Sequence, residues 1–378
     1  MSTIAVLLMV KNEKISIKNT IDSFKRYIDT VIVLDTGSTD NTIDIIKKTC
    51  ENNKQKLYLK KTVFKSFPES RNESIEFAES VSDATFFLLM DAGDELKTHL
   101  SSKINFINAI KNIPSIYNFG LVRHNWLVNG SLEDHFDARF IRNKNKCRYD
   151  IRYPVHEKFD KVSNDLTNLS DIFYLYQDRD KYGVSTQNRY LKDIEMLSNA
   201  IQNKRNLYYL GQTYLNMSDF ENGFKYNLLS YEKEIDDDEF GDHIIKNILV
   251  RIGYCAMRSN KSKKIVFEYL SKAIENFTEP PIEAFIFLLS YSIEQKITND
   301  VMIYVPKLFE LKKPTGPDLT MVNHGFYDYK RWNLISIVCL ISNQHIELGK
   351  KACQNALKVA NNPDDRNNMQ IYNYISKN

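Results

Sequence analysis

Residues 30–40 read TVIVLDTGSTD, and this stretch decides the fold of the N-terminal half of the chain. Its first five residues are apolar or β-branched, which is typical of a buried strand. Its remaining six residues are of the types that form turns and hold polar groups. Residues 41–52 then place Ile43, Ile46 and Cys50 at helical spacing. The stretch therefore predicts a strand, a polar turn and a helix in succession.

The same order of elements recurs on both sides of this stretch. Three more short apolar runs predict strands, at residues 4–9, 57–63 and 85–90. Helical spacing is found at residues 15–27 and 70–79. Alternating strands and helices predict an α/β domain with a mainly parallel sheet, which is Rossmann-like in plan. Ligands of such sheets bind beyond the carboxyl ends of the strands.

Polar clusters follow three of the predicted strands, at Asn12 and Glu13, at residues 35–40 and at residues 91–95. At a shared sheet edge they would suit a metal ion and a polar ligand. Each cluster alone could instead cap a helix, since Asp, Ser and Thr are good N-caps. The sequence contains no GxxxxGK[ST], GxGxxG or HExxH motif, which argues against P-loop, dinucleotide-binding and zinc-protease functions.

The second half of the chain has a different pattern, because strand signals vanish from residue 185 onward. Residues 207–214, LYYLGQTY, resemble the core of a tetratricopeptide repeat. Gly223, Ser230 and Gly253 occupy later positions at which small residues let two helices approach. We expect three to four helical hairpins in a short solenoid. Such a solenoid could bind an acceptor or a protein partner, mediate self-association, or only stabilise the first half.

Charge and composition exclude several classes of function. Lys and Arg total 51 against 48 Asp and Glu, a net charge of +3, so nothing favours a nucleic acid or an anionic membrane as partner. The five cysteines are scattered without a CxxC pair, which favours a reducing compartment. The apolar runs are too short to span a bilayer, and the N-terminus lacks the features of a signal peptide. The sequence thus predicts a soluble cytoplasmic protein.

Short segments along residues 10–157 together resemble glycosyltransferase family 2. They are VKNE at 10–13, VIVLDTGSTDNT at 31–42, SRN at 70–72, LMDAGDE at 89–95, RFIRN at 139–143 and VHE at 155–157. Their order makes the resemblance specific. It implies a GT-A fold, a nucleotide-sugar donor (UDP-sugar by preference), a Mn²⁺ or Mg²⁺ ion and inversion at the anomeric carbon. The acceptor would be a glycan or a protein.

The resemblance also assigns roles to residues. The expected donor contacts are Val10, Asn12, Glu13, Asp35, Ser38, Arg71, Asp91 and Ala92. Asp35 would meet the base, and Asp91 the ribose or a metal-bound water. The expected metal ligands are Asp91, Asp94 and His156. The family's Asp-x-Asp spacing is one residue longer here, so Glu95 is the alternative to Asp94 as the residue that faces the metal.

An inverting transfer needs a base that takes the proton of the acceptor hydroxyl. Asp134 and Asp137 are the two candidates, and the sequence does not separate them. Arg139 and Arg142 lie three residues apart on an expected strand, so they would face opposite sides and only one would reach the site.

The domain plan that follows is a catalytic domain at residues 1–183, a linker helix at 184–203 and a helical repeat domain at 204–378. A metal-dependent glycosyltransferase is the leading prediction. One alternative is a non-catalytic nucleotide-binding domain joined to a protein-interaction module, which the altered spacing after residue 91 favours. A nucleotidyltransferase is a third reading, but the sequence lacks the glycine-rich phosphate loop that we would expect near its N-terminus.

Overall fold

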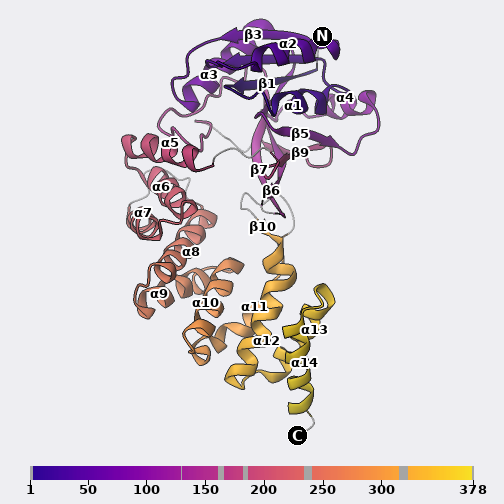
Figure 1. The fold of residues 1–378 in the computed structure, drawn as a ribbon. Coiled ribbons are helices and arrows are strands. Elements are labelled where there is room, and N and C mark those ends of the chain that lie inside the picture. The colour runs from indigo at the N-terminus through magenta and orange to yellow at the C-terminus, as the bar shows by residue number, and fades with distance from the viewer. Residues whose placement is uncertain are drawn as a thin grey trace. The chain divides into compact units, whose positions relative to one another are not determined.

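A computed structural model of the chain describes residues 3–128, 130–160, 166–181, 186–233, 241–314 and 322–376. The chain divides into two units (Figure 1). The first comprises residues 1–186 and 315–322, and the second comprises residues 187–314 and 323–378. The first two residues of the expected linker helix, 184 and 185, lie outside the described residues.

The first unit is built on a mixed sheet with the strand order β3-β2-β1-β4-β7-β6-β9-β5. Its parallel half consists of β3 (Lys56–Lys61), β2 (Thr30–Asp35), β1 (Ile4–Val10) and β4 (Phe86–Met90). The other half consists of β7 (Ser131–Arg142), β6 (Phe119–Val128), β9 (Phe173–Asp178) and β5 (Asp94–Thr98). β7 is antiparallel to both β4 and β6. Off this path, β8 (Leu166–Asn168) pairs with β6 and β10 (Val322–Asn323) pairs with β7.

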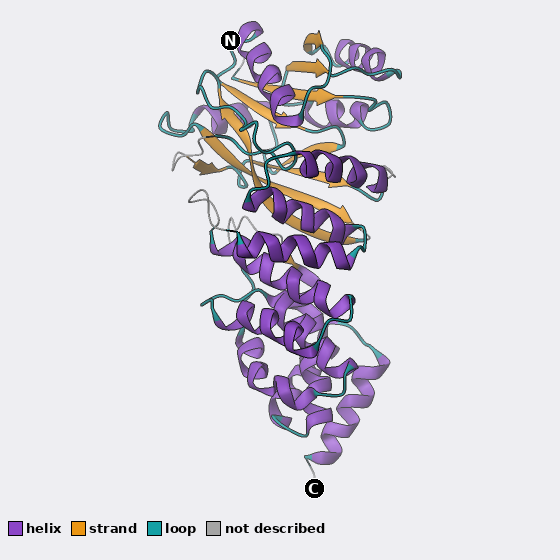
Figure 2. Ribbon diagram, turned by 90° about the vertical axis from the view of Figure 1, so that its left-hand side faces the viewer, coloured by secondary structure: helices purple, strands orange, loops and turns teal. Residues whose placement is uncertain are grey.

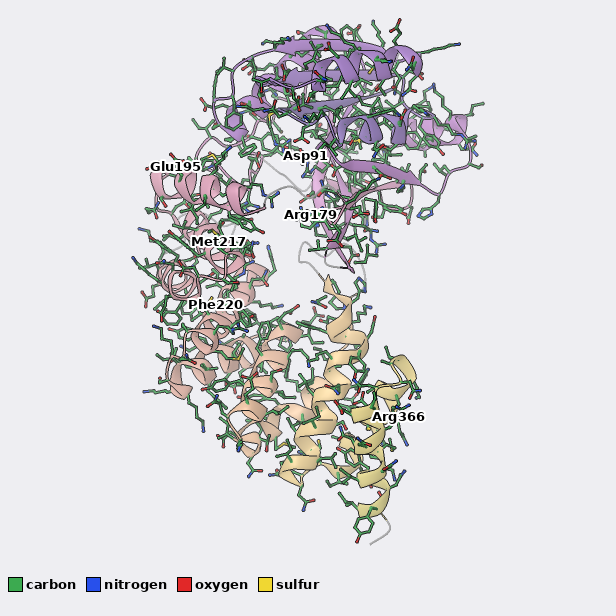
Figure 3. All side chains as sticks on the ribbon, viewed as in Figure 1. Asp91, Arg179, Glu195, Met217, Phe220 and Arg366 are labelled. Atoms are coloured by element: carbon green, nitrogen blue, oxygen red, sulfur yellow. The ribbon has the colours of Figure 1, made fainter. Side chains whose placement is uncertain are left out.

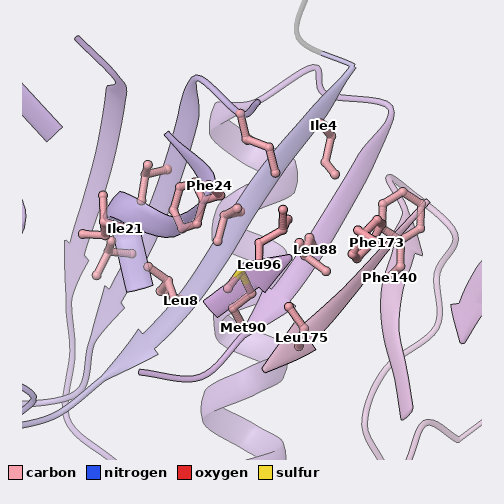
Figure 4. Packing of buried hydrophobic residues seen from close by; sticks show 14 of the residues in the cluster. Ile4, Leu8, Ile21, Phe24, Leu88, Met90, Leu96, Phe140, Phe173 and Leu175 are labelled. Atoms are coloured by element: carbon pink, nitrogen blue, oxygen red, sulfur yellow. The ribbon is translucent and has the colours of Figure 1, made fainter. Parts of the chain in front are cut away.

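Alternating residues of the central strands pack against helices on the two faces of the sheet. On one face Leu8 belongs to a core shared with α1 (Ile17–Phe24), α2 (Thr42–Asn52) and α4 (Lys103–Lys111). Figure 4 shows part of this core, including Ile21, Phe24 and Leu88. On the other face Leu7 packs in a second core with α3 (Phe67–Val81). Because helices cover both faces of the sheet, the central strands are continuous apolar runs, and such runs predict strands from the sequence.

The expected α/β half is confirmed, and its four predicted strands and three predicted helices are present. Sequence reasoning missed α4 and the strands β5, β6, β8, β9 and β10. β5 reads DELKT, in which polar residues outnumber apolar ones. It is the last strand of the sheet and pairs only with β9 along its path, so polar residues are tolerated there. Period-two apolar spacing is therefore absent from it, and the strand forms through its backbone pairing with β9.

The second unit is helical (Figure 2), as expected. Its described helices are α5 (Thr186–Asn199), α6 (Lys204–Asn216), α7 (Phe220–Glu232), α8 (Asp242–Arg258), α9 (Lys263–Glu275), α10 (Ile282–Glu294), α11 (Val305–Glu310), α12 (Arg331–Ser342), α13 (Ile346–Val359) and α14 (Pro363–Ile375), together with a 3₁₀ segment at Thr298–Tyr304 and a π segment at Phe326–Lys330. Contacts join α6 to α7, α7 to α8, α8 to α9, α12 to α13 and α13 to α14. Figure 3 marks Met217 and Phe220 at the turn between α6 and α7.

Small residues lie where these helices approach most closely. A Cβ atom at Gly253 would stand 2.5 Å from Cγ of Leu270, which joins α8 to α9. A Cβ atom at Gly223 would stand 3.0 Å from Sγ of Cys255. Ser230 is fully buried, and its hydroxyl donates to the carbonyl oxygen of Lys204 (2.8 Å). These positions were expected to be small on the repeat pattern, while the tetratricopeptide assignment itself stays a prediction.

Within the described parts of the chain, no helix has both the length and the apolar character needed to cross a lipid bilayer.

Candidate functional site

The carboxyl ends of β1, β2 and β4 meet at one edge of the sheet, because these strands are parallel neighbours. β1 ends at Val10, β2 ends at Asp35, and Asp91 directly follows β4. The three polar clusters expected from the sequence therefore share one edge. Figure 3 marks Asp91 there.

Hydrogen bonds join the loop after β1 to the loop after β2. The N–H of Asn12 donates to Oγ of Ser38 (3.0 Å), and Oδ1 of Asn12 accepts from the N–H of Thr39 (2.8 Å). Oδ1 of Asp35 accepts from the N–H of Ser38 (2.9 Å). Asn12 has a φ of 59°, a left-handed conformation that Asn tolerates better than most residues. Asp35 is buried beneath this loop pair and Asn12 is exposed on it.

Glu13 is held at the turn that leads into α1. Its N–H donates to Oγ1 of Thr42 (2.7 Å), and its Oε2 accepts from the hydroxyl of Ser16 (2.8 Å). Burial raises the pKa of Glu13, and the nearby charge of Asp91 adds to this rise against the opposing effect of the Ser16 bond.

Two other expected donor contacts are apolar residues of the core. Val10 is buried, and Ala92 packs against the same cluster while remaining half-buried. Polar contact with a donor at these positions would therefore come from the backbone.

Asp91 stands between two guanidinium groups. Its Oδ1 accepts from Nη2 of Arg71 (3.0 Å), and its Oδ2 accepts from Nη1 of Arg139 (2.8 Å). Arg71 comes from α3 and also donates from Nε to Oε1 of Glu157 (2.9 Å). Burial opposes the charge of Asp91, but the two arginines hold its pKa well below the usual range. The side chain of Asp91 is still 35% exposed, so an ionised carboxylate reaches solvent at this edge.

Asp94 lies in the interior of the protein and not at the surface where a ligand would bind. It is fully buried, its Oδ2 accepts from the N–H of Asp91 (2.9 Å), and its Oδ1 lies 3.0 Å from Nε2 of His124. Gly93, with a φ of 101°, turns the chain so that residue 94 faces inward. Glu95, the alternative to Asp94, is half-buried and pairs with Lys97 (2.7 Å).

The β6–β7 hairpin supplies a second group of polar side chains. His124 and His135 are directly opposite each other across the hairpin, with ring centroids 5.2 Å apart. Nε2 of His135 lies 2.9 Å from Oδ2 of Asp137, and Nδ1 of His124 lies 3.8 Å from the same oxygen. Burial raises the pKa of Asp137, but its contacts with the two histidines and with Arg139 outweigh this and lower it well below the usual range.

A β-bulge interrupts the pairing of β6 and β7 at Arg139. Leu121 pairs with Ala138 and Gly120 pairs with Phe140, so Arg139 has no partner residue on β6. Arg139 lies close to Asp137 (Nε to Oδ2, 3.5 Å) while it binds Asp91.

Arg142 does not reach the site, in line with the expectation that only one of Arg139 and Arg142 would. It donates to the carbonyl oxygens of Tyr117 (3.0 Å) and Pro114 (3.0 Å) and stacks on Phe86. Of the two arginines, Arg139 reaches the site.

The two expected bases lie on opposite faces of the hairpin. Asp137 shares a face with His135, because residues two apart on a strand point the same way. Asp134 is on the other face, where its Oδ2 pairs with Nη2 of Arg123 (2.8 Å). The structure therefore brings Asp137, and not Asp134, together with Arg139 and Asp91.

The expected metal ligands do not form a ligand group within the part of the chain that the structure describes. His156 is exposed with a φ of 54°, and its neighbour Glu157 contacts Arg71. Among the described residues, one set of His, Cys, Asp and Glu side chains brings its ligand atoms within 4.8 Å of one another, and it comprises His124, His135 and Asp137. Sequence reasoning missed both histidines because their pairing depends on the register of the hairpin.

Comparison with known proteins relates the N-terminal part of the chain to one protein family. Residues 5–153 match the family model described as Glycosyl transferase family 2. This stretch contains Asp91 and its two arginine partners. Together with the sheet described above, the match confirms the expected GT-A fold class for the N-terminal unit, followed by a helical region.

Two bacterial relatives match over part of their length. A protein of Rickettsia felis and one of Rickettsia typhi, each described as an uncharacterized glycosyltransferase, are 33% and 34% identical to this chain over 112 residues. The match spans 30% of this chain and 36% and 35% of the two relatives. It thus covers about a third of the length of each curated relative.

Solved structures show weaker likeness. S. aureus TarS 1–349 in complex with UDP-GlcNAc is 14% identical, with a TM-score of 0.36 over 91% of this chain and 93% of that one. The mannosyltransferase PcManGT from Pyrobaculum calidifontis, in complex with GDP-Man and Mn²⁺, is 10% identical, with a TM-score of 0.36 over 81% of this chain and 86% of that one.

Proposed function

We propose that this chain, whose N-terminal part carries a glycosyl transferase family 2 domain, transfers a sugar from a nucleotide-sugar donor to a glycan or protein acceptor. The observation that carries the proposal is the position of Asp91. Its carboxylate stands at the carboxyl edge of the parallel strands, held by Arg71 and Arg139. Fixed positive groups at this edge suit a diphosphate, because that group leaves the donor as an anion.

The residues at this edge fit one divalent cation that is shared with the donor. Mg²⁺ typically keeps several waters and binds through one or two carboxylates together with substrate phosphates. Asp91 supplies one partly exposed carboxylate, so a bound diphosphate would complete the ligand set. We therefore propose Asp91 as the residue that holds Mn²⁺ or Mg²⁺. The ion would offset the charge of the leaving diphosphate.

Asp94 is proposed to position Asp91 rather than to bind the ion directly. Its carboxylate is buried and accepts the N–H of Asp91, so it holds the loop after β4 in place. His156 keeps its proposed role as a further contact for the donor or its ion.

The nucleoside of the donor is proposed to lie along the loop pair after β1 and β2. Asn12 and Ser38 stand at its surface and Asp35 lies beneath, so their hydrogen bonds would hold the loops in shape before a ligand binds. Glu13 lies at the same edge. A uracil base, and hence a UDP-sugar, is the donor that we propose from the family resemblance.

Asp137 is the proposed base for the acceptor hydroxyl. It is ionised, 36% exposed and on the same face as Arg139, and inversion would follow from attack by the hydroxyl on the side of the sugar opposite the diphosphate. The helical unit is proposed to hold the acceptor, a protein partner or a second copy of the chain. Residues 1–183, 184–203 and 204–378 remain our proposed catalytic domain, linker helix and repeat domain.

The alternative function, a non-catalytic nucleotide-binding domain with an interaction module, is favoured by one observation. Because Asp94 is buried, the loop after β4 exposes Asp91 but not a second aspartate of an Asp-x-Asp pair. A domain that only binds a nucleotide could work with this reduced set.

A thermal-shift panel tests the proposal. Nucleotide sugars are each added with Mn²⁺, Mg²⁺ or EDTA, and transfer or hydrolysis of the positive donor is then measured. A donor at a hundred times its Kd should stabilise the protein by about 2.7 kcal/mol. The shift should need a metal ion and should be lost in Asp91→Asn, measured against that variant's own unliganded midpoint.

The matched pair of variants is Arg139→Lys and Arg142→Lys. Both keep the charge, but only Arg139 contacts Asp91, so donor binding should weaken in Arg139→Lys alone. A donor that binds without being transferred or hydrolysed would support the non-catalytic alternative. Absence of any shift and of any hydrolysis would rule out the proposed glycosyltransferase.

A further inference from the structure

The β6–β7 hairpin carries a group of side chains that the proposed transfer does not fully use. His124 is 2% exposed, and its Nδ1 is buried without a hydrogen-bond partner among the described residues. His135 and Asp137 lie on the same face of the hairpin as His124. Oδ2 of Asp137 is near both Nδ1 of His124 and Nε2 of His135. We propose that His124, His135 and Asp137 bind a divalent transition-metal ion, Zn²⁺ by preference, at a site separate from Asp91.

The spacing of the ligand atoms fits such an ion. Oδ2 of Asp137 lies 2.9 Å from Nε2 of His135 and 3.8 Å from Nδ1 of His124. Ligands bound tetrahedrally to Zn²⁺ at about 2.0–2.1 Å stand about 3.4 Å from one another. These two distances bracket that value, and all three ligand atoms lie within 4.8 Å of one another, so side-chain rotations would bring them into the coordination sphere of one ion.

Asp94 prepares His124 to act as a ligand. The buried carboxylate of Asp94 lies 3.0 Å from Nε2 of His124, and the N–H of that nitrogen donates to it. Nδ1 of the same ring is then on the side of Asp137, 3.8 Å from its Oδ2. Metal-binding histidines commonly donate their other ring N–H to a carboxylate in this way, which fixes the tautomer and the orientation of the ring.

The charge around the site also favours a cation. Asp94 and Asp137 bring two carboxylates, and the guanidinium of Arg139 near Asp137 is already paired with Asp91. Two imidazoles with one carboxylate form a ligand set that suits Zn²⁺ better than Mg²⁺. Asp137 is 36% exposed, so an ion and a water as fourth ligand can enter from solvent.

Binding involves one exchange. The ion takes the place of the protons on the two ring nitrogens that face Asp137, Nδ1 of His124 and Nε2 of His135, and these protons go to solvent. An ion held by Asp137 also removes that carboxylate as a base, so Zn²⁺ at this site should suppress transfer that Mn²⁺ at Asp91 supports. Ion binding itself does not rest on the proposed function.

The experiment measures metal binding to the full chain without any nucleotide. Metal-stripped protein is titrated with Zn²⁺ against a chromophoric chelator, and Co²⁺ is added in parallel, because its visible absorption reports tetrahedral coordination by nitrogen and oxygen. The expected result is one tightly bound equivalent, weakened at least a hundredfold in His135→Asn. The matched control is His99→Asn, which changes an exposed histidine outside the group.

A second pair of variants guards against loss of folding. Asp137→Asn keeps the shape of a partly exposed side chain and should also weaken binding, whereas Asp134→Asn, on the opposite face of the same strand, should leave it unchanged. Circular dichroism confirms that each variant is folded. Binding that is equally tight in His135→Asn and Asp137→Asn, or that disappears in Asp134→Asn or His99→Asn, would overturn the proposal. Because no donor is present, either result is independent of glycosyl transfer.

Discussion

At the scale of single residues, the alternation of a strand decides which side chains can act together. Asp134 and Asp137 are three residues apart, so they face opposite sides of the β6–β7 hairpin. Asp134 forms an ion pair with Arg123, while Asp137 lies beside Arg139. Arg139 is two residues from Asp137 and contacts it, so two residues of β7 contribute to one site.

This difference gives a prediction about the base. Asp137→Asn removes the proposed proton acceptor, so transfer should fall by about 10²–10⁴-fold while donor binding is retained. Asp134→Asn, on the opposite face, should keep kcat within a small factor of the parent value. The measurement is kcat for transfer with saturating donor. Equal losses in the two variants would argue against Asp137 as the base.

At the scale of elements, polar ties between helices add to the packing of the sheet. Asp22 of α1 accepts from Nδ2 of Asn53 at the end of α2 (3.0 Å) and pairs with Lys25 (3.1 Å). Burial opposes its charge, but these contacts and the one with Lys18 lower the pKa of Asp22 to about 2.

The lowered pKa predicts a dependence of stability on pH. Because the folded-state pKa lies below the unfolded value, Asp22 contributes stability above pH ~4 that is lost as the pH falls towards about 2. After allowance for solvent screening, the contribution is about 1 kcal/mol. The gap in urea midpoint between the parent and Asp22→Asn should be present at pH 6 and shrink below pH 4. Asp83→Asn, an exposed aspartate, is the control, and a gap that does not change with pH would contradict the assignment.

A second prediction at this scale concerns the close approach of α8 and α9. Gly253→Ala places a methyl group 2.5 Å from Cγ of the buried Leu270, so the helices must move apart. Overpacking of this kind destabilises by about 1–3 kcal/mol. Gly325→Ala is the control, because the added Cβ would meet its nearest neighbour at an ordinary 3.5 Å. Thermal unfolding of the two variants checks this, and equal midpoints would show that α9 accommodates the methyl group.

At the scale of the whole molecule, the chain divides into two units that each have a core of their own. Separate cores allow separate unfolding transitions, since cooperativity extends only as far as the contacts within a unit. We expect two calorimetric transitions. A nucleotide-sugar donor with Mn²⁺ should raise one of them, and Gly253→Ala should lower the other. One transition that responds to both changes would show instead that the units unfold together.

Elements with a local sequence signal could be predicted without the structure. Apolar runs predict the strands at residues 4–9, 30–34 and 85–90, because these strands are buried on both faces. Helical spacing of apolar residues predicts helices in the second half, because each of them buries one face. The polar residues that follow these strands could also be placed at one edge of the sheet, because parallel strands align their carboxyl ends.

The combination of side chains in the site depends on contacts between distant segments and could not be predicted from local sequence. The polar strand β5 forms by pairing with β9, and the register of β6 against β7 sets His124 opposite His135. The inward turn at Gly93 places Asp94 against His124 instead of at the surface. Pairing, register and a single left-handed residue are set by contacts between segments far apart in the chain, and the local pattern of residues does not contain them.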